Sequence, residues 1–154
     1  MYDVKPITTA YATACGPACL AMLLKYYGIE VPLEQLIEEC HTGIVGCSAK
    51  TLMDVGRSHG LTLSAWGFTA NGILTQDRPA IIWWEYDHFV VFCGLNEAGE
   101  PVICNPMSGR FPISKETFER KFSGVVVSHG RPEDQLDSFD YFGESIEIPD
   151  YFND

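Results

Sequence analysis

The spacing of apolar residues changes from a helical to a strand-like period at Gly60, and this change limits the folds open to the chain. Before it, apolar residues recur at helical spacing in the segments 15–27, 32–41 and 49–59, which predicts three amphipathic helices. Gly28 follows the first segment as a helix-ending residue, and Ser48 precedes the third as an N-cap. Residues 1–14 are expected to be extended.

After Gly60, the apolar runs are short and are separated by turn residues, as in strands. We expect strands at 61–66, 79–84, 88–95, 101–105 and 124–128, and short helical segments at 69–74 and 114–122. The turn at 96–99 predicts a hairpin between the third and fourth of these strands. Helices followed by antiparallel strands indicate an α+β fold, with N-terminal helices packed on an antiparallel sheet.

The length of 154 residues, of which 46% are hydrophobic, is enough for one domain with its own core. The apolar runs, such as 80–84 and 89–93, are far too short to span a bilayer. The N-terminus lacks the basic and apolar regions of a secretion signal. We therefore expect a cytoplasmic protein that does not span the membrane.

The six cysteines do not have the spacing of a strong metal site. They are Cys15, Cys19, Cys40, Cys47, Cys93 and Cys104. Paired C-x-x-C motifs, which are typical of structural zinc, do not occur among them. Because no export signal is visible and the core needs no cross-links, we expect reduced thiols, with no metal and no cofactor.

The net charge of −11 is concentrated at the C-terminal end. Residues 131–154 carry eight acidic side chains against one arginine, which leaves −4 for residues 1–130. No basic patch indicates a nucleic-acid partner. We expect a folded domain over 1–130 and an acidic, aromatic-containing tail over 131–154, which either docks on the domain or remains a solvated segment.

Cys15 lies at the predicted start of the first helix. A helix N-terminus carries partial positive charge and unpaired N–H groups, which stabilise a thiolate and can hold an oxyanion. Cys15 is therefore a candidate nucleophile, and its own backbone N–H is a candidate oxyanion donor. Taken alone, the residue also fits the simpler interpretation of a small buried side chain.

His88 and Asn105 are the candidate partners of this thiol. His88 opens one strand of the predicted hairpin and Asn105 closes the other, so both are expected at the same edge of the sheet. A histidine there can take the thiol proton and return it to a leaving amine, and Asn105 can hold its ring. The order Cys, His, Asn is that of papain-like cysteine enzymes. His41, His59 and His129 fit this role less well.

Three motifs together closely resemble the double-glycine leader peptidase domain of bacteriocin- and lanthipeptide-exporting ABC transporters. They are Cys-Gly-x-Ala-Cys-Leu-Ala-Met from Cys15 with Tyr-Tyr-Gly at 26–28, Asp-His-Phe-Val-Val at 87–91, and Asn-Pro at 105–106 with Gly109 close behind. The resemblance covers roughly residues 8–128. It implies a papain-like peptidase that cuts precursors after a Gly-Gly or Gly-Ala pair, with Cys15 as nucleophile, His88 as base and Asn105 as the orienting residue.

Two positions depart from that family pattern. The family usually has aspartate where this chain has Asn105, and an amide stabilises imidazolium less than a carboxylate does. The family also has a glutamine six residues before the cysteine to complete the oxyanion hole, and here that residue is Thr9. Losing such a donor costs about 100- to 1000-fold in rate. Thr8, Tyr11 and Thr13 carry hydroxyls that could substitute.

The resemblance leaves three functions open. The first is a cysteine peptidase acting through a Cys15 thioester on a precursor with an amphipathic leader helix. The second is a non-proteolytic module that binds the leader or cargo, and the third is an acyl or amide transferase on the same fold. The chain has no G-x-x-x-x-G-K-[ST] motif. It is therefore expected to be free-standing or to work with a separate ABC exporter.

Overall fold

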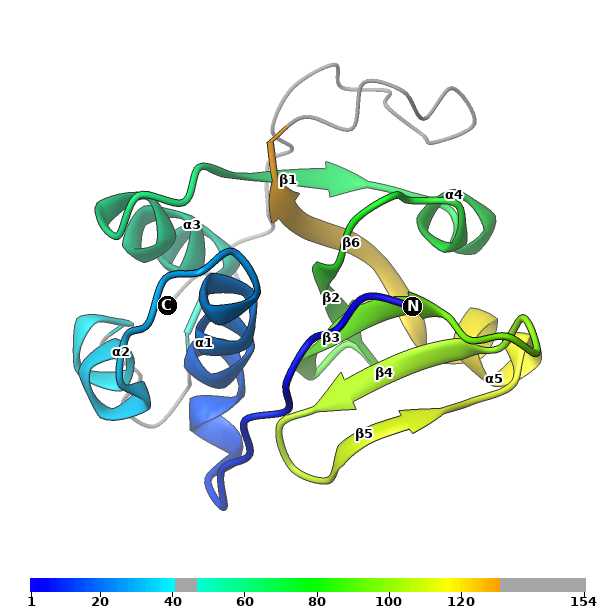
Figure 1. Cartoon of the computed structure of the whole chain (residues 1–154), viewed down its shortest axis with the longest axis horizontal. Coiled ribbons are helices and arrows are strands. Elements are labelled where there is room, and N and C mark those ends of the chain that lie inside the picture. The colour runs from blue at the N-terminus through cyan, green and yellow to red at the C-terminus, as the bar shows by residue number, and fades with distance from the viewer. Residues whose placement is uncertain (41–46, 131–154) are drawn as a thin grey trace.

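The computed structural model describes residues 1–40 and 47–130, and these form the expected helices and strands together with the unpredicted η1 and β5 (Figure 1). The helical elements are η1 (Ala12–Ala14), α1 (Cys15–Tyr26), α2 (Leu33–Cys40), α3 (Ala49–Ser58), α4 (Ala70–Leu74) and α5 (Lys115–Lys121). The strands are β1 (Leu63–Gly67), β2 (Ala80–Trp84), β3 (His88–Leu95), β4 (Pro101–Asn105), β5 (Gly109–Pro112) and β6 (Phe122–His129). The predicted tail and His41 lie outside the described residues.

The strands form a six-stranded antiparallel sheet in the order β1-β6-β2-β3-β4-β5. The α+β fold expected from the sequence is therefore confirmed, as is the β3–β4 hairpin, in which Val91 pairs with Cys104. Strand β5 was not expected, because its four residues are largely exposed and lack alternation of apolar and polar residues. It pairs with β4 at the edge of the sheet, where Gly109 lies opposite Asn105.

Alternate residues of the sheet face two separate apolar cores. Helices α1, α2 and α3 cover one face, on which Phe89, Val91 and Cys93 of β3 point toward α1. On the other face, Val90 and Phe92 pack with Phe118 of α5 and Ile73 of α4. Figure 1 shows α1–α3 gathered on one side of the sheet and α4 and α5 on the other. Strands β2 and β3 are consequently buried on both faces, with few exposed positions.

The N-terminal segment, residues 1–9, runs beside β3 and β4 (dark blue in Figure 1). The backbone N–H of Tyr2 donates to Cys93 O at 2.8 Å, and that of Thr9 donates to Pro106 O at 2.8 Å. Val4 is fully buried between them. The expected extended conformation therefore holds for these residues, but it ends earlier than predicted because 12–14 form the single turn η1.

Within residues 1–40 and 47–130, no helix combines the length and the apolar character needed to cross a membrane.

The second core depends on one aromatic side chain. Phe118 is fully buried, and its ring centroid lies 5.5 Å from that of Trp84, 5.7 Å from that of Phe92 and 5.5 Å from that of Phe122. We expect Phe118→Ala to lower the free energy of unfolding by about 3–5 kcal/mol, because it leaves a cavity among these rings. Urea denaturation measures the change.

The matched control is Phe111→Ala on β5, where the side chain is already 37% exposed. This variant is expected to lose at least about 1 kcal/mol less than Phe118→Ala, because part of the Phe111 side chain is already in water. Equal losses for the two variants would contradict the assignment of Phe118 to the centre of this core.

Candidate active site

Cys15 is the first residue of α1 and is only 3% exposed. The turn η1 leads directly into the helix, and the backbone N–H of Cys15 donates to Ala12 O at their junction. Pro17 is tolerated in the first turn because its missing N–H would have no partner inside the helix. The sequence-predicted nucleophile is thus at a helix N-terminus, but its own N–H is engaged within the protein.

A strained turn positions His88 at the start of β3. Glu85 and Tyr86, which connect β2 to β3, have φ angles of 54° and 58°, a region that non-glycine residues rarely adopt. Three hydrogen bonds hold them: Glu85 N–H to Lys121 O, Tyr86 N–H to Ser123 Oγ, and Asp87 N–H to Trp84 O. The turn therefore fixes the backbone of both Asp87 and His88.

The structure brings Cys15 and His88 to the same cleft, which has a volume of about 180 Å³. Its lining comes from η1, α1, the segment before α3 and the β2–β3 hairpin. The lining residues are Ala12, Thr13, Cys15, Gly16, Cys47, Trp83, Asp87, His88 and Phe89. A thiol and an imidazole in one small cleft are the elements needed for nucleophilic catalysis with a general base.

The carboxylate of Asp87 contacts the ring of His88. Asp87 Oδ1 lies 2.5 Å from His88 Nδ1. Asn105 ends β4 at the same edge of the sheet, as expected, but its Oδ1 accepts the backbone N–H of Met107 at 2.9 Å. Among the hydrogen bonds of the described residues, none joins His88 to Asn105. The partner of the imidazole in this structure is therefore Asp87.

Burial and a nearby negative charge keep the Cys15 thiol protonated. Desolvation is the larger cause and the carboxylate of Asp87 the smaller, and together they raise the pKa of Cys15 to about 11. Both effects disfavour the thiolate. The helix N-terminus alone does not generate a nucleophile here, so the thiol proton must be removed when a substrate reacts.

Thr9 does not line the cleft, although it lies on the segment that leads to it. Its Oγ1 accepts the backbone N–H of Tyr11 at 3.2 Å, and its own N–H is bound to Pro106 O. Thr13, four residues later, does line the cleft beside Cys15. Of the hydroxyls considered from the sequence, Thr13 is therefore the one beside the thiol.

Sequence reasoning missed Asp87 and Cys47 as cleft residues. The only signal for Asp87 was its position next to His88, and regular strand alternation would have turned the two side chains to opposite faces. The left-handed turn residues before it remove that alternation. Cys47 is distant in sequence, and no pattern indicated that it would approach α1. The ideal Cβ position of Gly16 lies 3.3 Å from Cys47 Cβ, so a glycine keeps this contact open.

The two other histidines among the described residues are engaged elsewhere. His59 Nε2 lies 2.6 Å from Glu39 Oε1, and His129 Nδ1 lies 2.9 Å from Thr62 O. A larger pocket between α2 and α3 is lined by carboxylates and contains neither a thiol nor an imidazole, so it lacks the chemistry of the smaller cleft. In the part of the chain that the structure describes, no group of three or more His, Cys, Asp or Glu side chains is arranged to hold a metal.

Comparisons with known proteins agree on one family. The model of the peptidase C39 family matches residues 3–134. The colicin V secretion/processing ATP-binding protein CvaB of Escherichia coli is 26% identical over 113 residues, which are 73% of this chain and 16% of that protein. An uncharacterized protein of Methanothermobacter thermautotrophicus is 26% identical over 121 residues, 79% of this chain and 84% of its own length. The chain thus spans about a sixth of the transporter relative.

A solved structure gives the same result. The crystal structure of a double glycine motif protease from an AMS/PCAT transporter, in complex with the leader peptide, has a TM-score of 0.78 and 32% identity. The match covers 82% of this chain and 90% of that one. The resemblance inferred from the three sequence motifs is therefore confirmed at the level of family and fold.

The state of the Cys15 thiol can be measured directly. Because its pKa is raised to about 11, we expect its alkylation by iodoacetamide to keep accelerating up to pH 10 without a plateau. Asp87→Asn removes one of the two causes and is expected to accelerate alkylation at pH 8. Mass spectrometry of the Cys15 peptide gives the rates, and Cys15→Ala provides the blank. A plateau reached below pH 7 would indicate a preformed thiolate and contradict this description.

Proposed function

The chain belongs to the peptidase C39 family, and from this premise we propose that it is a cysteine peptidase that cleaves peptide precursors after a double-glycine-type leader. The observation that carries the proposal is the meeting of Cys15 and His88 in one cleft at the N-terminus of α1. The 32% identical protease solved with its leader peptide supports the substrate class.

In the proposed reaction, His88 removes the proton from the Cys15 thiol as the sulfur attacks the carbonyl carbon of the scissile bond. The tetrahedral oxyanion then collapses, His88 returns the proton to the leaving amine, and a thioester remains on Cys15. Water activated by His88 hydrolyses the thioester and releases the leader. The raised pKa of Cys15 fits a mechanism in which proton removal accompanies attack.

We propose that Asp87, in addition to Asn105, orients the imidazole. With Asp87 Oδ1 against Nδ1, the other ring nitrogen is the one left to take the thiol proton. A carboxylate also stabilises the imidazolium formed during attack more strongly than an amide does. The family usually has an aspartate at the position of Asn105. In this chain the carboxylate beside the ring is then that of Asp87.

For the oxyanion, we propose the Cys15 N–H as one donor, released from Ala12 O when the acyl oxygen arrives. The second donor is a hydroxyl of the segment before Cys15. Thr13 lines the cleft, whereas the Thr9 hydroxyl oxygen is already held by Tyr11 N–H. Thr13 is therefore better placed than Thr9 for this role.

The partners follow from the same premise. We propose a precursor peptide with an amphipathic leader helix as the substrate and a separate ABC exporter as the partner. The relatives CvaB and MchF support the exporter, because their names describe secretion/processing ATP-binding proteins.

A non-proteolytic leader-binding module is the second candidate. Two observations favour it: the Cys15 N–H is bound to Ala12 O, and the Cys15 pKa is raised. Both would lower the rate of acylation without affecting the binding of a leader.

The two candidates differ in covalent chemistry. A peptide aldehyde ending in Gly-Gly is expected to form one adduct on the protein, seen as a mass increase equal to the aldehyde, and none on Cys15→Ala. Intact-mass spectrometry reads the result, and circular dichroism verifies that the variant is folded. If no adduct forms while the leader still binds, the peptidase proposal fails and the binding module replaces it.

The orienting residue can be identified with three variants. We expect Asp87→Asn to lower kcat by about 10- to 100-fold with little change in KM, because the ring loses its carboxylate partner. Asn105→Ala is expected to cost less. In the Asp87→Asn background, Asn105→Asp should restore part of the lost kcat by returning the charge from the other strand. A larger loss for Asn105→Ala than for Asp87→Asn would assign orientation to Asn105 instead.

A further inference from the structure

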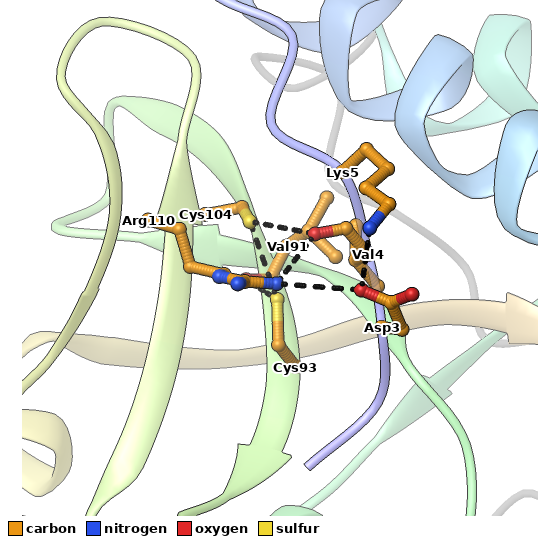
Figure 2. A network of polar contacts seen from close by, with 7 residues as sticks. All are labelled: Asp3, Val4, Lys5, Val91, Cys93, Cys104 and Arg110. Carbon is orange, nitrogen blue, oxygen red and sulfur yellow. Dashed lines mark hydrogen bonds and ion pairs between the residues drawn. The ribbon is translucent and has the colours of Figure 1, made fainter.

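Two buried thiols lie side by side on neighbouring strands (Figure 2). Cys93 of β3 and Cys104 of β4 are fully buried, and their Sγ atoms are 3.4 Å apart. Neither residue lines the cleft that contains Cys15. The proposed peptidase chemistry does not use them.

Arg110 of β5 and the N-terminal segment surround this pair. Arg110 is the cross-strand partner of Cys104, and its Nη1 donates to Val4 O at 2.9 Å. Asp3 Oδ1 lies 3.1 Å from Lys5 Nζ and 4.0 Å from Arg110 Nη1. Of these charged groups, the Arg110 guanidinium is the one that acts on both thiols. Such surroundings favour a thiolate.

We propose that Cys93 and Cys104 are a second thiol centre, which a hydroperoxide converts to a cross-strand disulfide. Cys104 reacts first and Cys93 resolves the product. This proposal rests on the thiol pair and the charges around it, and it is independent of the function assigned to Cys15.

The contacts of the pair distinguish the roles of the two thiols. Cys93 S–H can donate to Cys104 Sγ at 3.4 Å or to Val91 O at 3.6 Å, and Cys104 Sγ lies 3.9 Å from Val4 O. The bond from Cys93 lowers the pKa of the Cys104 thiol, burial opposes the change, and the Arg110 guanidinium adds to the lowering. The same bond and burial raise the pKa of Cys93 well above its ordinary value. Cys104 is therefore the thiol closer to the reactive, deprotonated form.

The proposed reaction balances without any further reagent. The Cys104 thiolate attacks one oxygen of hydrogen peroxide, the O–O bond breaks, and after protonation the products are Cys104 sulfenic acid and water. Cys93 sulfur then attacks the Cys104 sulfur, the S–O bond breaks, and the thiol proton leaves with the hydroxyl as a second water. The protein loses two electrons, and one peroxide becomes two waters.

Bond formation requires the Sγ atoms to approach from 3.4 Å to about 2.05 Å. The backbone can adjust at this place, because the β3–β4 register shifts between Phe92 and Leu95, and Gly94 beside Cys93 has a φ of 89°. Peroxide is small, and the segment packed against the pair is a chain terminus, the kind of segment that opens most readily.

The test uses the full 154-residue protein. The protein is reduced, freed of reductant and treated with hydrogen peroxide. It is then denatured in the presence of iodoacetamide, which alkylates the remaining free thiols, and digested without reduction. We expect a peptide linked through Cys93 and Cys104, 2 Da lighter than the two reduced peptides, which dithiothreitol separates. Cys19 and Cys40, each buried on a helix, are internal controls and should be modified about tenfold more slowly or less.

Two variants test the assigned roles. In Cys93→Ala, dimedone should trap a sulfenic acid at Cys104, and no linked peptide should form. In Arg110→Met, the inflection of the linking rate should move to higher pH, because the guanidinium that favours the Cys104 thiolate is lost. Lys5, Asp3 and Cys19 remain as the other charged or titratable groups near the pair. If Arg110→Met only changed the access of peroxide to the pair, the linking rate would change by the same factor at every pH.

If Cys93 and Cys104 are both alkylated singly after peroxide treatment of the folded protein, the proposed centre does not exist. Linkage of either residue to Cys15 or Cys19 would also overturn it. Loss of the Cys15 adduct with the peptide aldehyde, by contrast, would affect only the proposed peptidase function.

Discussion

The packing of α1 against the sheet determines where the chemistry takes place. Ten consecutive residues of this helix, from Cys15 to Leu24, are buried, so the helix can neither rotate nor slide without exposing apolar surface. Its contacts with β3 through Phe89, Val91 and Cys93 fix its N-terminus beside the start of that strand. Because Cys15 begins α1 and His88 begins β3, the same apolar contact that stabilises the domain also brings the thiol and the imidazole together.

The site combines this rigid placement with unfavourable ground-state electrostatics. Burial and the Asp87 carboxylate disfavour a free thiolate, while the same carboxylate contacts the His88 ring. The Cys15 thiol therefore stays protonated in the resting protein, beside the ring that we propose takes its proton.

Much of the fold could be predicted because its elements are long and periodic. The helices at α1 and α3, the Ser48 cap and the β3–β4 hairpin all follow local rules that the residues obey. The candidate pair Cys15 and His88 was also accessible, because each begins an element whose position the topology sets. The short edge strand β5 could not be predicted, because it is a strand through its pairing with β4 and its composition is not that of a strand.

The parts of the site that escaped prediction depend on irregular backbone. Asp87 reaches the His88 ring only because Glu85 and Tyr86 adopt left-handed conformations, and no rule of alternation anticipates this. The engagement of the Cys15 N–H by Ala12 O similarly depends on one turn, η1. In both cases, tertiary hydrogen bonds select a conformation that the local sequence does not favour.

The turn at Glu85 and Tyr86 also determines which distant loops of the chain can accept insertions. Its hydrogen bonds come from Lys121 and Ser123, at the junction of α5 and β6, more than thirty residues away. An insertion at this junction would release the turn and misdirect His88, and it would also displace Phe122 from the second core. The tip at 96–99, which lies at the opposite end of β3, has no such connection and can vary in length. Evolutionary length variation should therefore be frequent at one loop and absent at the other.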